Sequence, residues 1–64
     1  MTETIKTIKR IAGEKNISQA NLARQSGITE ATISRWFSGQ REPSIKNVER
    51  LCDVLDLRLI VTYR

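Results

Sequence analysis

Residues 18–39 read SQANLARQSGITEATISRWFSG, and the interpretation of the whole chain starts from this stretch. Ser18 and Thr29 are good helix N-caps, and each precedes a short block with helical spacing. Gly27 lies between the blocks, where a sharp turn needs positive φ. We therefore predict two short helices joined by a tight turn, the first ending at Gln25 or Ser26 and the second at Ser38.

Small and apolar residues in this stretch predict how the two helices pack. Ala23 is small enough for the second helix to cross close to the first, and Ile28 and Ile33 fill the angle between them. Trp36 then closes the wedge. Two short helices joined by a glycine-containing turn form a helix-turn-helix arrangement. In this arrangement the second helix exposes the face opposite Ile33, Trp36 and Phe37.

Two further amphipathic helices are predicted outside this stretch. The first runs from about Thr2 to Lys15, ends at a left-handed Asn16, and carries an apolar stripe of Ile5, Ile8, Ile11 and Ala12. Gly13 within it indicates a close approach by a neighbouring helix. Ser44 caps the last helix, whose apolar face is Ile45, Val48, Leu51, Cys52 and Leu55. The predicted fold class is all-α, with four short helices around a central helix-turn-helix.

The C-terminal segment from Leu57 to Tyr63 has a different pattern. Its sequence LRLIVTY is rich in β-branched residues and alternates in polarity, which predicts a β-strand. A lone strand needs a partner for its backbone N–H and C=O groups, and a two-fold copy supplies one. We expect residues 1–56 to form the helical domain and 57–64 a dimerisation strand; an unpaired tail is the alternative. The dimerisation residues are Leu57, Leu59, Ile60, Val61 and Tyr63.

Composition excludes several classes of protein. The 64 residues include one cysteine and no histidine, so an internal disulfide is impossible and a zinc site is not expected. The chain lacks a nucleophile–base pair and a glycine-rich phosphate loop, so we predict neither an enzyme nor a cofactor. There is no signal peptide and no apolar run of about 18 residues, which predicts a cytoplasmic protein without membrane contact. The net charge of +4 favours an anionic partner.

The spacing Gln19-x-x-Leu22-Ala23-x-x-x-Gly27-Ile28-x-x-x-x-Ile33-Ser34-x-Trp36, followed by Gly39, Arg41 and Pro43-Ser44, resembles Cro/CI-type (XRE-type) helix-turn-helix proteins. These include phage repressors, restriction-modification controllers and antitoxins. The resemblance extends from about Ile5 to Leu57. It implies a lambda-repressor-like fold and binding to double-stranded DNA. Members often add a fifth helix after the fourth, whereas this sequence predicts a strand there.

The resemblance implies that the second helix of the motif enters the major groove. The base-reading candidates on its exposed face are Glu30, Ala31, Thr32, Ser34 and Arg35. Arg35 suits guanine and Ala31 suits a thymine methyl group. Glu30 has two interpretations, because it could accept a hydrogen bond from cytosine or stabilise the helix dipole.

Other residues are candidates for contacts with the DNA backbone. They are Gln19, Arg41, Lys46 and Asn47, with Arg24 and Arg10 as weaker candidates. Each could equally be a solvated side chain, and Gln19 could simply begin its helix. Cys52 lies on an apolar stripe, which favours a buried structural thiol over a redox switch.

These observations predict a transcriptional repressor that binds a pseudo-palindromic operator as a homodimer. Its half-sites would lie about one helical turn apart, ~34 Å. The alternative is an antitoxin-type interaction module that neutralises a toxin and autoregulates its operon.

Overall fold

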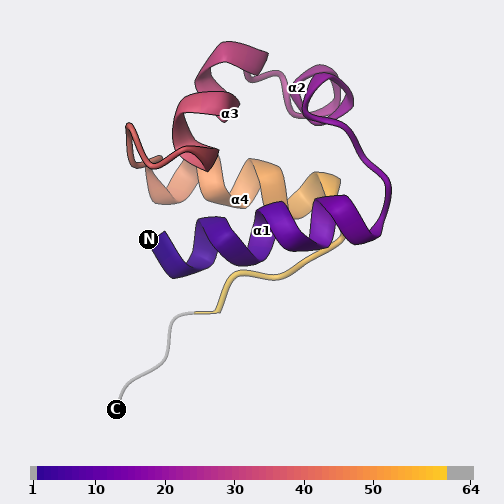
Figure 1. Cartoon of the computed structure of the whole chain (residues 1–64). Coiled ribbons are helices and arrows are strands. Elements are labelled where there is room, and N and C mark those ends of the chain that lie inside the picture. Colours follow the sequence, from indigo (N-terminus) through magenta and orange to yellow (C-terminus); the bar gives the residue numbers. More distant parts are fainter. Residues whose placement is uncertain (1, 61–64) are drawn as a thin grey trace.

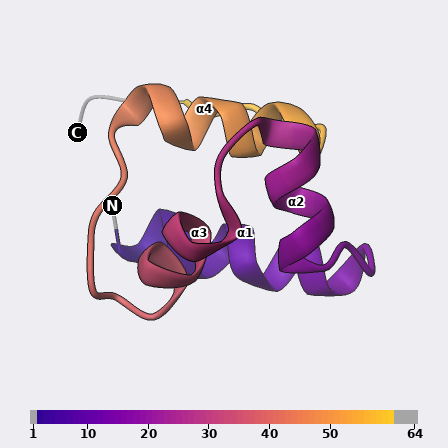
Figure 2. The same ribbon diagram turned by 90° about the horizontal axis from the view of Figure 1, so that it is seen from above.

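The computed structural model describes residues 2–60, which form four helices arranged in two layers (Figure 1). The helices are α1 (Thr2–Glu14), α2 (Gln19–Ser26), α3 (Glu30–Phe37) and α4 (Ile45–Val54). α1 and α4 contact each other in one layer, and α2 and α3 form the other. Seen from above in Figure 2, α2 lies crosswise at one end of α1 and α4. The all-α class is confirmed for these residues.

Three helices begin at the N-caps that the sequence predicts. The hydroxyl of Ser18 accepts a hydrogen bond from the Asn21 N–H at 3.1 Å. Thr29 does the same for α3 and Ser44 for α4, each at 3.2 Å. Because each cap satisfies an otherwise free N–H, it fixes where its helix starts.

Left-handed residues end the helices and turn the chain. Asn16 has φ 58° and Gly27 has φ 76°, as predicted, and Gly39 has φ 82°. Asp56, with φ 58°, is a fourth such residue, and the sequence did not predict it. After α4 the Leu57 N–H donates to the Cys52 carbonyl at 2.7 Å, which closes the helix in a Schellman-type turn.

The core lies between the two layers and draws on all four helices. Its most deeply buried residues include Leu22 from α2, Ile33 from α3 and Leu51 from α4. The full set of buried apolar residues is Ile5, Ile8, Ala12, Leu22, Ile28, Ile33, Trp36, Val48, Leu51, Cys52 and Leu55. The predicted wedge is present, since Ile28, Ile33 and Trp36 are buried and Ala23 packs against them.

The structure corrects two predictions about individual residues. Ile45 does not belong to the apolar face of α4, because its side chain is 53% exposed at the first position of that helix. Gly13 does not mark a close approach between helices, since a Cβ atom there would meet nothing within 4 Å.

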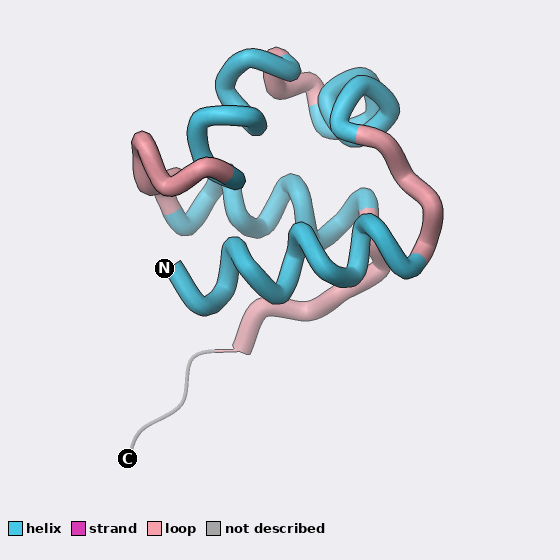
Figure 3. The backbone as a smooth tube through the Cα atoms, in the orientation of Figure 1, coloured by secondary structure: helices cyan, strands magenta, loops and turns pink. Residues whose placement is uncertain are grey.

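The structure does not support the predicted strand in the part of the C-terminal segment that it describes. Residues 57–60 form no strand (Figure 3), because residues 2–60 contain no second extended segment to pair with them. The alternating pattern of the residues in this segment has another cause. Leu57 and Leu59 are half-buried against the core of their own chain, while Arg58 and Ile60 are exposed. Val61 and Tyr63 lie outside the described residues.

A long-range hydrogen bond joins the residues that follow α1 and α4. The Lys15 ammonium donates to the Leu55 carbonyl, just beyond the end of α4. A cation at this position also interacts favourably with the negative end of the helix dipole. The contact therefore fixes the ends of α1 and α4 relative to each other.

Two glycine substitutions should change stability in opposite directions. Gly13 lies inside a helix in open space, so Gly13→Ala should raise the free energy of unfolding by about 0.5–1 kcal/mol. Gly27→Ala should lower it by about 1–2 kcal/mol, because its left-handed backbone penalises any Cβ atom. Urea denaturation followed by circular dichroism measures both. Equal effects of the two substitutions would contradict the turn geometry.

Candidate nucleic-acid interface

The outer face of α3 is exposed and carries polar or small side chains. Helical geometry sets this arrangement, because Ile33 and Trp36 are buried on the opposite side of the same eight-residue helix. Of the predicted base-reading residues, Glu30, Ala31, Ser34 and Arg35 are exposed and Thr32 is half-buried. The structure thus brings all five together on one short helix.

Two of these side chains differ in how firmly they are held. The Thr32 hydroxyl accepts a hydrogen bond from the Thr29 hydroxyl at 2.7 Å, so it is tied to the cap of α3. The Arg35 guanidinium has no hydrogen-bond or ion-pair partner among residues 2–60. It remains available to an external acceptor.

The loop after α3 is folded back onto the end of the helix. The Arg35 carbonyl accepts the N–H groups of Gln40 at 2.9 Å and Arg41 at 3.3 Å, and the Ser38 hydroxyl at 3.1 Å. These bonds hold the backbone of the exposed Arg41 at the C-terminal end of α3. Gln40 is exposed in the same turn, although the sequence analysis did not single it out. The signal in the sequence was the glycine at position 39, which indicates a turn after α3.

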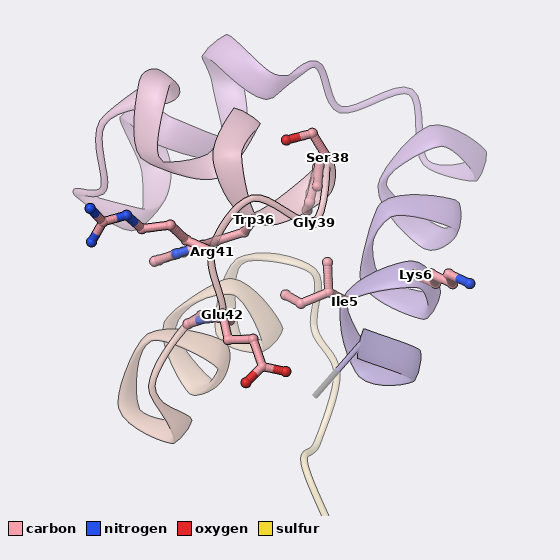
Figure 4. Close-up of a pocket in the computed structure, with 9 residues that line it drawn as sticks. Ile5, Lys6, Trp36, Ser38, Gly39, Arg41 and Glu42 are labelled. Atoms are coloured by element: carbon pink, nitrogen blue, oxygen red, sulfur yellow. The ribbon is translucent and has the colours of Figure 1, made fainter.

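A small cavity of about 140 Å³ separates this loop from the start of α1. Ile5, Trp36 and Pro43 contribute apolar walls. Figure 4 shows Arg41 and Lys6, which also line this cavity, on opposite sides of it. The side chain of Arg41 is exposed to solvent.

The remaining backbone-contact candidates lie at helix N-termini, where free N–H groups favour an anion. Gln19 is the first residue of α2 and is half-buried. Lys46 is exposed and Asn47 half-buried in the first turn of α4. Both helices contact each other, and α2 also contacts α3.

The two weaker candidates are engaged in local contacts. Arg10 forms an exposed ion pair with Glu14 at 2.7 Å, and the Arg24 guanidinium donates to the Asn21 side-chain oxygen at 2.6 Å. An exposed pair of this kind contributes at most about 1 kcal/mol. These contacts compensate the charge of Arg10 and orient the side chain of Arg24.

Cys52 is buried, as predicted, with a side chain that is 5% exposed. Burial raises the pKa of its thiol, and the nearby carboxylates of Asp53 and Glu49 raise it further. The thiol is therefore neutral and enclosed, which suits a structural role.

No group of three potential metal ligands occurs among residues 2–60. None of the helices described there has the length and apolar character needed to cross a bilayer.

The glycine turn and the buried wedge hold a short helix with one face exposed. This arrangement defines a helix-turn-helix DNA-binding protein. The family model described as Helix-turn-helix matches residues 8–61. The chain belongs to this XRE-type family, whose Cro/CI-type members are DNA-binding transcription regulators. Comparison with curated proteins and with solved structures gave no match.

The burial of Cys52 predicts slow reaction with a thiol reagent. Labelling of the native chain should be at least about tenfold slower than in denaturant, because the thiol is enclosed and its thiolate is disfavoured. The raised pKa also means that the thiol's contribution to stability is complete below its unfolded pKa and is lost as pH rises through the folded one. Equal labelling rates with and without urea would contradict this burial.

Proposed function

We propose that this protein is a transcriptional repressor that inserts α3 into the major groove of a pseudo-palindromic operator as a homodimer. The observation that carries the proposal is the division of α3 into two faces. Ile33 and Trp36 anchor one face in the core, and Ser34 and Arg35 stand exposed on the other. A helix of this kind fits the major groove and reaches base edges with its outer side chains.

The base-reading roles follow from side-chain chemistry. Arg35 donates two hydrogen bonds to one guanine, which the absence of an internal partner among residues 2–60 favours. Ala31 contacts a thymine methyl group. Ser34 and Thr32 exchange single hydrogen bonds with base edges, and Glu30 accepts from cytosine or supports the helix dipole.

The backbone contacts position α3 without reading sequence. Arg41 pairs with a phosphate beside the end of α3, where the bonds to the Arg35 carbonyl hold it. Gln19 at the N-terminus of α2, and Lys46 and Asn47 at the N-terminus of α4, contact phosphates on the two sides of α3.

A two-fold dimer would present two copies of α3 to successive major grooves. The half-sites would then be centred about one helical turn apart, ~34 Å. Repression follows if the bound dimer occupies the DNA that the polymerase needs.

The proposal is tested by selecting bound sequences from random duplex DNA at a stated salt concentration. The expected result is a consensus with two inverted half-sites at this spacing. A consensus without symmetry would contradict the dimer, and enrichment of no sequence would contradict base reading by α3.

Arg35→Ala should weaken operator binding by about 1–3 kcal/mol and relax the preference at one base pair in each half-site. The reason is the loss of a bidentate contact with a base. Binding to operator and to single-base variants, measured by fluorescence anisotropy, reports this change. Equal losses on operator and random DNA would contradict the base-reading role.

Arg41→Ala should instead weaken binding to all DNA sequences alike. It should also lower the salt dependence of the binding constant by about one released counterion. A phosphate contact carries no sequence information, so the consensus should stay the same. Lys9→Ala is the matched control, since it removes the same charge from an exposed position on α1. If Lys9→Ala had the same effect, net charge alone would explain the loss.

A further inference from the structure

The side chains of Thr29 and Thr32 are joined by a pair of hydrogen bonds. The Thr29 hydroxyl oxygen accepts the backbone N–H of Thr32 at 3.2 Å, which caps α3. The same hydroxyl donates its proton to the side-chain oxygen of Thr32 at 2.7 Å. Because both bonds connect the same two residues, they hold the Thr32 hydroxyl in one orientation relative to the helix.

The two bonds also set which way the Thr32 hydroxyl is polarised. A hydroxyl has one proton to donate and two positions at which it can accept. An oxygen that accepts a hydrogen bond becomes a better donor, so the bonds in a chain strengthen one another in one direction. Here the chain runs from the Thr32 N–H through the Thr29 hydroxyl to the Thr32 hydroxyl. Its last member is therefore a strengthened donor whose proton is left for an external acceptor.

The second hydroxyl on the outer face of α3 is not fixed in this way. The Ser34 side chain is exposed and forms no hydrogen bond with another group among residues 2–60. Its hydroxyl can rotate to donate or to accept. Thr32 thus differs from Ser34 because the protein itself sets the direction of its outward hydrogen bond.

We propose that Thr29 is a positioning residue that makes Thr32 a hydrogen-bond donor toward the base edges of the major groove. The inference rests on the proposed insertion of α3 into that groove and adds the chemical groups that Thr32 recognises there. Guanine offers the acceptors N7 and O6, adenine offers N7 and thymine offers O4, whereas cytosine presents only its N4 amino donor. Thr32 therefore selects against cytosine at the base that it contacts.

The first test identifies that base. Thr32→Val keeps the shape of the side chain and removes the hydroxyl. The wild-type chain should bind about tenfold more weakly when cytosine replaces the preferred base at one position, and Thr32→Val should lose this discrimination. Fluorescence anisotropy on consensus duplexes that carry each of the four bases at each position measures it. Ser34→Ala is the matched control and should leave the preference at this position unchanged.

The second test changes the direction of the hydrogen bond between the side chains at positions 29 and 32. Asparagine and aspartate are both good N-caps and have the same shape, so α3 should keep its start in Thr29→Asn and Thr29→Asp. The amide of Thr29→Asn can donate to Thr32 as the native hydroxyl does. The carboxylate of Thr29→Asp only accepts, so it takes the Thr32 proton and leaves the Thr32 oxygen to accept from a base.

Thr29→Asn should therefore keep the preference against cytosine, and Thr29→Asp should reverse it by about three- to tenfold in favour of cytosine. The added charge of Thr29→Asp should weaken binding to all sequences, so the readout is the ratio of affinities for two bases at one position. A change in helix stability alone leaves this ratio unaltered. Equal base preferences of Thr29→Asn and Thr29→Asp, or a Thr32→Val variant that keeps every wild-type preference, would overturn the proposal.

The preference that depends on Arg35 separates this inference from the proposed function. If the wild-type chain discriminates between no bases, the proposed function fails. If Arg35→Ala relaxes the preference at its own base pair while the two Thr29 variants read DNA alike, only this inference fails.

Discussion

The burial of Ile33 sets the direction in which α3 faces. Ile33 is fully buried, and successive helical residues turn by about 100°, so Ser34 and Arg35 are rotated out of the core. Eight residues are too few for a stable isolated helix, and α3 persists because its cap and its packing compensate. The packing of Ile33 in the core thus both stabilises α3 and orients its outer face. Any change that moved Ile33 out of the core would remove both.

The turns at the ends of the helices determine the arrangement of the chain as much as the packing of the helix interiors does. Left-handed residues at positions 16, 27, 39 and 56 each change the direction of the chain where a helix ends. After α3 this turn brings two backbone N–H groups onto the Arg35 carbonyl, which anchors Arg41 at the C-terminal end of α3. After α4 it directs residues 57–60 back under α1. The position of Arg41 and the course of residues 57–60 are therefore both products of helix termination.

Local signals in the sequence predicted most of this fold. The caps at Ser18, Thr29 and Ser44 and the turn at Gly27 depend on neighbouring atoms only, so short-range patterns identify them. The prediction that Ile45 belongs to the apolar face of α4 failed, because the first residue of a helix can point away from the face that the later residues define. Leu57 and Leu59 form no strand within their own chain, because alternation also records half-burial and the partner of an extended segment is not encoded locally. The exposed face of α3 could be derived from helical period, but its base preferences depend on DNA that the sequence does not contain.

The small size of α3 bears on how selectivity for a symmetric site would arise. A single α3 offers few base contacts, so one copy alone distinguishes DNA sequences weakly. Joining two copies makes the second contact intramolecular, and the gain depends on the geometry of the link rather than on new base contacts. In the proposed dimer, base preference would depend on the outer face of α3 and half-site spacing on the residues that join the copies. Either property could then change by substitution without loss of the other.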